Sequence, residues 1–156
     1  MIQRIQTVYL LLSIILLTIV SFGNPIFYLI GNKIYEFTLF GVFDTVKVEG
    51  AKTYSNYPLY LVSILAVILQ VIAIFSFKDL KRQSLLVKIS GLLHVLLIFA
   101  VIAYYFLHSN PVQTEQTTIQ IGNGFYLISL SLIGIILANN GIKRDKKLID
   151  SLNRLR

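Results

Sequence analysis

The sequence predicts an all-α membrane protein: a four-transmembrane-helix bundle with a small β-hairpin or sheet in the first outer loop and an amphipathic C-terminal helix. Two observations support this fold class. Of the 156 residues, 56% are hydrophobic and only 13% are charged, whereas soluble domains carry about 25% charged residues. The apolar residues also gather in four long runs, and a chain of this size has too little interior to bury them all. A lipid bilayer is therefore the expected solvent.

The four apolar runs cover residues 5–22, 59–77, 85–107 and 123–140. Each approaches the ~20 residues that a helix needs to cross the ~30 Å hydrocarbon core of a bilayer. We therefore expect a single membrane domain, with outer loops at 23–58 and 108–122 and a tail at 141–156. The first run also resembles a cleaved signal peptide, with small residues at Ser21 and Gly23, but its length favours a retained span,.

Basic residues predict which ends of the runs face the cytoplasm. Eleven of the 14 Lys and Arg lie in the N-terminus, the 78–88 connection and the tail, whereas the two outer loops hold three bases and four acids. Because cytoplasmic flanks are enriched in Lys and Arg, four spans place both termini in the cytoplasm. The net charge of +7 therefore reflects topology. No aromatic residue interleaves the bases of the tail, so no nucleic-acid partner is expected.

Residues 26–40 carry a hairpin pattern, because Gly31 and Asn32 separate two β-prone runs,. A two-residue turn there pairs Tyr28 with Tyr35 across the strands. A lone hairpin is only marginally stable in water. We therefore expect the hairpin either to lie against the membrane surface or to take a further strand, for which residues 112–121, rich in Thr and Ile, are the candidate.

The first outer loop is also rich in aromatic residues, and its candidate surface consists of Tyr28, Tyr35, Phe37 and Phe40. Two interpretations stay open. These side chains can form an interfacial belt together with a miniature core. They can instead form a docking surface for a periplasmic or membrane protein, to which an outer sheet edge would add a strand.

Gln70 and His94 are the candidate intramembrane polar pair. Each lies twelve residues from Arg82 in the connection between the second and third runs, so both fall at a similar depth,. We predict an interhelical hydrogen bond between them that serves helix packing; a proton-relay or ligand-binding role is the alternative. One His without companion ligands does not indicate a metal site. No catalytic constellation and no cofactor site is recognisable, so no enzyme is expected.

The fourth run carries a stripe of small residues that includes Ser131, Gly134, Ala138 and Gly141. Small side chains let two helices approach closely. The stripe can serve packing within the chain or dimerisation, so a homo-oligomer stays an open alternative.

The tail resumes a helical pattern after Gly141, where we expect the helix to break so that the tail lies along the inner leaflet,. Apolar side chains fall on one face of this segment and basic ones on another. The candidate lipid- or partner-binding residues are Lys143, Arg144, Lys146, Lys147, Leu148, Ile149, Leu152 and Leu155. Each base near an anionic membrane surface adds about 1 kcal/mol of attraction, so membrane lipids are expected partners.

Three stretches resemble a known family: MIQRIQTVYLLL at residues 1–12, FKDLKRQ at 77–83 and LANNGIKRDKKLIDSLNRLR at 137–156. They are similar to small membrane proteins of Bacteroidota classed as domain of unknown function 4293. The resemblance extends over the whole chain in length and span layout. It implies the bacterial inner membrane as the location, and it implies no activity, cofactor or active-site residue.

These patterns together predict an inner-membrane accessory or scaffolding protein without catalytic activity, which meets partners through its tail and its outer β-loop. The alternative is a small transporter or channel subunit, or a lipid- or hydrophobe-binding membrane protein. A hydrophobic cavity between the spans with Gln70 and His94 on its wall would favour that alternative.

Overall fold

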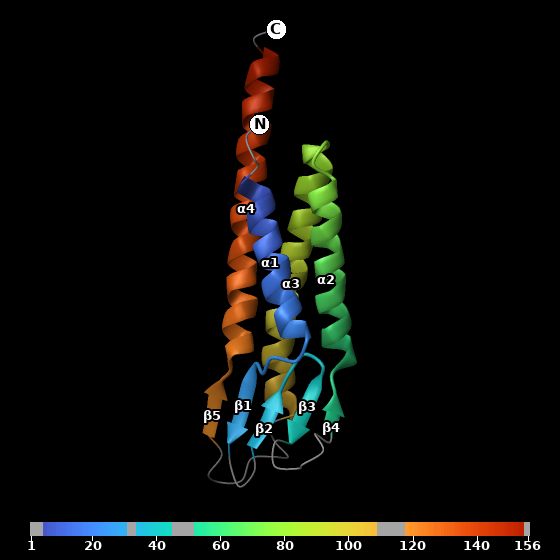
Figure 1. Ribbon diagram of the computed structural model, residues 1–156, viewed down its shortest axis with the longest axis vertical. Helices are drawn as coiled ribbons and strands as arrows, with labels where there is room; N and C mark the ends of the chain where they lie inside the picture. The colour runs from blue at the N-terminus through green and yellow to red at the C-terminus, as the bar shows by residue number, and fades with distance from the viewer. Residues whose placement is uncertain (1–4, 31–33, 45–51, 109–117, 155–156) are drawn as a thin grey trace.

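The computed structural model of the protein describes residues 5–30, 34–44, 52–108 and 118–154. Within these ranges a bundle of helices runs along the long axis, and a β-sheet lies at one end (Figure 1). The helices are α1 (Ile5–Ser21), α2 (Tyr57–Phe75), α3 (Leu80–His108) and α4 (Asn123–Arg154). The strands are β1 (Phe27–Ile30), β2 (Ile34–Phe37), β3 (Gly41–Asp44), β4 (Lys52–Ser55) and β5 (Thr118–Ile121).

α2 buries mainly small and polar side chains and exposes large apolar ones. The side chains that α2 buries are those of Leu59, Ser63, Ala66, Gln70 and Ala73. On its outer face, Leu61 is 64% exposed and Phe75 is 75% exposed. A helix in lipid has this pattern, because large apolar side chains face the acyl chains while small ones allow close helix packing. Within the described residues, α2, α3 and α4 are long and apolar enough to cross a membrane, which indicates a membrane protein.

The predicted bundle of four transmembrane helices is wrong in its first member. α1 has 17 residues, which rise about 25 Å, less than the ~30 Å hydrocarbon core. The helix ends just before Gly23, whose φ of 106° lies in the left-handed region that commonly follows a helix C-terminus. The candidate spans in the described part of the chain are therefore three. α1 packs beside α4 and α2.

Local signals explain where the two central helices begin. Pro58 lies in the first turn of α2, where its missing N–H costs no helical hydrogen bond. The Asp79 carboxylate accepts hydrogen bonds from the backbone N–H groups of Lys81 and Arg82, at 2.9 and 3.1 Å. These donors would otherwise lack partners at the start of α3. The cap explains why α3 begins at Leu80, ahead of the predicted boundary at residue 85.

The sheet has the strand order β4-β3-β2-β1-β5, and every neighbouring pair is antiparallel. β5 belongs to the second outer loop and pairs with β1, which confirms the candidate strand in residues 112–121. β3 and β4 extend the sheet on its other side. The all-α class is therefore wrong, because a five-stranded sheet replaces the small hairpin.

The hairpin of β1 and β2 has a register that differs by one residue from the predicted one. Three residues, 31–33, separate the two strands, so Phe27 faces Phe37 and Tyr28 does not face Tyr35. Burial explains this register. Phe27 and Phe37 are 9% and 2% exposed and belong to the core that the sheet shares with the helices. A shift of one residue would turn one strand's apolar side chains to the other face.

α4 continues without a break through Gly141, so the predicted helix break and the flat-lying tail helix are wrong. The glycines of α4 have another role. A Cβ atom at Gly141 would lie 3.2 Å from the Cβ of Gln6 in α1, and one at Gly134 would lie 3.3 Å from the Cβ of Ser13. The small-residue stripe therefore packs α4 closely against α1.

Two further glycines join the start of α4 to the segment before β1. The N–H of Gly122 donates to the Ile26 carbonyl and that of Gly124 to the Pro25 carbonyl, both at 2.8 Å. A Cβ at Gly122 would overlap the Pro25 carbonyl oxygen. This junction holds the β5–α4 corner against the α1–β1 connection.

We expect Gly122→Ala to lower the thermal unfolding temperature of the detergent-solubilised protein by roughly 3–10 °C, because relieving the overlap costs about 1–3 kcal/mol. Gly91→Ala is the matched control. A Cβ at Gly91 would meet only Ile135, at an ordinary 3.4 Å, and Ala favours the helix. An equal decrease in both variants would contradict the role of the junction.

Candidate functional site

A layer of polar side chains crosses the middle of the helix bundle. It consists of Ser13 in α1, Gln70 in α2, Ser90 and His94 in α3, and Ser131 in α4, all of them 0% exposed. One hydrophobic cluster lies between this layer and the sheet, and a second lies on the other side. Every helix therefore contributes at least one polar side chain at the same height.

His94 links three helices through this layer. Its Nδ1 lies 2.9 Å from the Ser90 carbonyl oxygen, and its Nε2 lies 3.1 Å from Ser131 Oγ. A carbonyl only accepts, so Nδ1 donates to Ser90. Ser131 Oγ, beside Nε2, donates to the Ser13 carbonyl oxygen at 3.1 Å. Ser13 Oγ lies 2.9 Å from Ser131 Oγ and can donate to it in turn. The hydroxyl and imidazole groups thus connect α1 through α4 to α3.

The predicted Gln70–His94 hydrogen bond is wrong, although both side chains are buried in this layer. Gln70 Nε2 donates to Ser90 Oγ at 3.2 Å, and Gln70 Oε1 has no partner among the described residues. Ser90 Oγ donates in turn to the Ala66 carbonyl at 3.4 Å. Ser90 lies one helical turn before His94, so it faces α2 while His94 reaches α4.

The hydrogen bonds of this layer join α1 to α4, α4 to α3 and α3 to α2. No Asp or Glu occurs in α1, α2 or α3, or in α4 before Asp145. Two grooves of the described structure, one between α1 and α4 and one beside Thr18 and Tyr60, include neither Gln70 nor His94 in their walls.

The four candidate aromatic residues of the first outer loop do not form one exposed surface. Phe37 is 2% exposed in the shared core, and Tyr35 packs against that core. The ring of Phe40 meets Tyr60 of α2 edge-on, with 5.2 Å between centroids. Tyr28 is half-buried. Phe37, Tyr35 and Phe40 serve to join the sheet to the helices.

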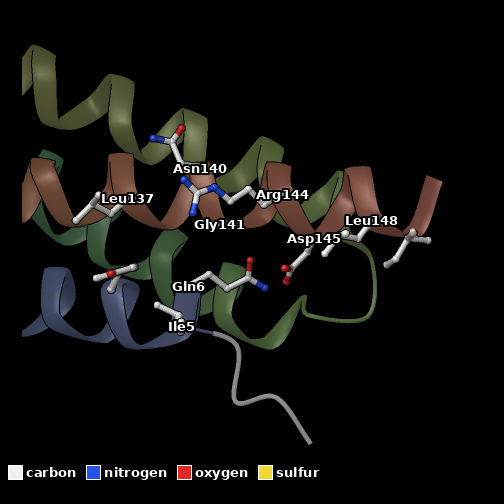
Figure 2. A pocket seen from close by; sticks show the side chains of 10 residues that line it. Ile5, Gln6, Leu137, Asn140, Gly141, Arg144, Asp145 and Leu148 are labelled. Carbon is white, nitrogen blue, oxygen red and sulfur yellow. The ribbon is translucent and has the colours of Figure 1, made fainter. Parts of the chain in front are cut away.

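A groove of about 500 Å³ lies between the first turns of α1 and the second half of α4, at the end of the bundle away from the sheet (Figure 2). Its polar wall comprises Gln6, Asn140, Arg144 and Asp145. Gln6 is 2% exposed, and neither atom of its amide has a hydrogen-bond partner among the described residues. The groove therefore contains unused hydrogen-bonding capacity beside two opposite charges.

The tail residues extend along α4 beyond this groove. Lys143, Arg144, Lys146 and Lys147 are exposed. Leu148 and Ile149 are 64% and 44% exposed, and they also line the outer end of the groove. The side chains of Leu152 and Leu155 lie outside the described part of the structure. Of the apolar stripe in the tail, the structure therefore describes the side chains of Leu148 and Ile149 only.

Sequence patterns alone do not identify several residues of the polar layer and of the groove between α1 and α4. Ser13 and Ser131 are ordinary in apolar helices, and Ser131 showed itself only as a member of the small-residue stripe. Gln6 lies near the N-terminus, where a polar residue is usually solvated. Gln6 and Asp145 share a groove only because α4 continues past Gly141. A glycine inside a helix lowers helix propensity, so the sequence favours a break at this position.

The family model described as Domain of unknown function (DUF4293) matches residues 2–155. The chain belongs to this family. No curated protein matches the sequence. Membership in DUF4293 agrees with the resemblance of the three stretches quoted above, and the family description names no activity.

We expect Ser131→Ala to destabilise the bundle by about 0.6 kcal/mol, and by at most ~2 kcal/mol, because it removes the contact of His94 with α4 and that of Ser13 with α4. Reversible unfolding in mixed micelles measures this loss. Ser129→Ala is the matched control, since Ser129 Oγ bonds only the Phe125 carbonyl of its own helix. Equal effects of the two changes would contradict a bridging role for the layer.

Proposed function

We propose that the protein is a non-catalytic accessory or scaffolding protein of the bacterial inner membrane, and that the second half of α4 docks a partner protein. One observation carries this proposal. α4 continues past the start of α1 and past the α2–α3 connection (Figure 1). It presents exposed Leu148 and Ile149 there, beside four basic side chains.

Charge supports a cytoplasmic position for this end of the bundle. Lys78, Lys81 and Arg82 lie in and next to the α2–α3 connection, and the bases of α4 lie at the same end of the molecule as the start of α1. Cytoplasmic flanks of membrane helices are enriched in Lys and Arg. The sheet lies at the opposite end and would face the periplasm.

The direction of α4 favours a protein partner over the lipid surface. Ser84 near the start of α3 and Asn139 of α4 are hydrogen-bonded at 3.5 Å, so Asn139 marks the depth of the basic α2–α3 connection. Leu148 lies nine residues farther along the helix, about 13 Å at 1.5 Å per residue. With the leaflet surface at the depth of this connection, Leu148 and Ile149 would lie beyond it in water. Apolar side chains that protrude into water are typical of protein interaction sites.

The sheet supports a second contact at the other end. β5 is an edge strand, paired on one side with β1, and its four residues are exposed. Ile119 and Ile121 point to one face and are 51% and 52% exposed. An unpaired edge with apolar side chains favours strand addition by a partner.

Topology is testable because the chain contains no Cys. We expect Lys147→Cys to react with a membrane-impermeant maleimide only after the inner membrane is opened, and Thr118→Cys to react in intact spheroplasts. The reverse pattern, or equal labelling of both sites, would contradict the proposed orientation.

We expect a photoreactive phenylalanine analogue at Leu148 to crosslink one protein of defined mass in intact cells. Ile136, which is 52% exposed on the same helix within its apolar part, is the matched control and should crosslink lipid. If Leu148 yields lipid adducts alone, or the same protein adducts as Ile136, the docking proposal is wrong.

A further inference from the structure

We infer that the groove between α1 and α4 binds the head group of a phospholipid that carries a primary ammonium, of the phosphatidylethanolamine type. This inference goes beyond the proposed docking role and does not rest on it. It rests on the unpartnered amide of Gln6, the opposite charges of Arg144 and Asp145, and the apolar wall below them.

Gln6 supplies the first observation, a buried side-chain amide in the wall of the groove. The close approach of Gly141 to the Gln6 Cβ fixes the base of this side chain between the two helices. Its amide is buried and has no hydrogen-bond partner among the residues that the structure describes, and an unsatisfied buried polar group costs about 1–3 kcal/mol. Figure 2 shows the amide extending along the groove toward Asp145. A ligand that both donates to Oε1 and accepts from Nε2 would remove this cost.

Arg144 and Asp145 supply the second observation. They are consecutive residues of α4, both in the groove wall, and neither has an ion-pair partner among the described residues. A guanidinium binds phosphate oxygens through a rigid fork of N–H donors, and a carboxylate accepts hydrogen bonds from an ammonium. The two charges therefore complement a zwitterion that contains a phosphate and an ammonium.

The apolar residues of the groove indicate a lipid rather than a soluble zwitterion. Leu137 and Tyr9 form the wall on the membrane side of Asn140. Leu137 is 42% exposed and Ile133, one turn deeper, is 51% exposed. The groove thus opens onto the lipid-facing surface of α4, along which acyl chains can run.

The charges of the groove also discriminate among phospholipids. A quaternary choline ammonium has no N–H group, so it cannot donate a hydrogen bond to Asp145 or to Gln6 Oε1. A glycerol head group carries no ammonium, so the Asp145 carboxylate would face a lipid with a net negative charge. The bases outside the groove attract every anionic lipid through a diffuse field that salt screens. Selectivity for the primary ammonium therefore originates from Asp145 and Gln6.

Native mass spectrometry of the full-length protein in mild detergent tests this inference. Phosphatidylethanolamine, phosphatidylcholine and phosphatidylglycerol with identical acyl chains are added separately to delipidated protein. We expect one phosphatidylethanolamine to bind about tenfold more tightly than phosphatidylcholine, the ratio that one charge-assisted hydrogen bond supports. Soluble glycerophosphoethanolamine should not displace it at equal concentration. Equal binding of all three lipids, or full displacement by the soluble head group, would overturn the inference.

Variants assign the effect to the groove. Asp145→Asn should abolish the preference over phosphatidylcholine while phosphatidylglycerol binding is kept or strengthened. Arg144→Gln should weaken all three lipids, whereas Lys147→Gln, with the same charge change outside the groove wall, should leave the ethanolamine preference intact. Gln6→Leu should lose the preference and raise the unfolding temperature of the lipid-free protein. If Asp145→Asn keeps the preference, or Lys147→Gln loses it, the assignment is wrong. The crosslink at Leu148 tests the docking proposal and the lipid titration tests this inference, so either one can fail without the other.

Discussion

The close contact between α1 and α4 is the constraint on which the rest of the structure depends. Gly134 and Gly141 let the two helices approach, and the Ser13–Ser131 hydrogen bond at 2.9 Å lies beside that approach. The same contact orients Ser131 toward His94 on α3, brings β1 next to β5, and leaves a groove where α1 begins beside the continuing α4. Replacing a single glycine of this interface by a larger residue would disturb all of these features.

The polar layer fixes the relative heights of the helices, which apolar packing alone does not do. In lipid, the hydrophobic effect gives helices no preference for one relative height over another, because acyl chains are as apolar as Leu. Hydrogen bonds are directional, and each bond of the layer forms only when the helices stand at the correct height. His94, Ser90 and Ser131 therefore align the hydrophobic clusters on either side and keep the four helices in one arrangement.

The sequence allowed much of this structure to be predicted where a strong periodic signal existed. The spans at 59–77, 85–107 and 123–140 follow from long apolar runs, and the β5 strand follows from composition. The errors arose where two physical effects compete. Gly141 favours a helix break by propensity, but packing against Gln6 retains it inside α4. The hairpin register was decided by burial of Phe27 and Phe37 rather than by the Gly-Asn pair. α1 looked like a span because its apolar run was counted, whereas Gly23 ends the helix at 17 residues.

The sites were less accessible to sequence reasoning than the fold. Gln70 and His94 were recognised as buried polar residues, yet their partners Ser90 and Ser131 depend on how each helix is rotated about its axis. The groove requires two segments that are more than 130 residues apart, Gln6 and Asp145, to lie together. Such long-range proximity leaves no trace in local pattern, because each residue is unremarkable within its own helix.

The pairing of β1 with β5 has a consequence for biosynthesis. Residues 30 and 118 are neighbours across the two strands, but the intervening chain includes two complete helices. At ~5–20 residues per second, translation of that interval takes roughly 4–18 s. During this time the outer edge of β1 lacks its final partner and is open to wrong pairing. Closure of the sheet is therefore a late step, and it can follow only after β5 has been synthesised and has reached the end of the bundle where β1 lies.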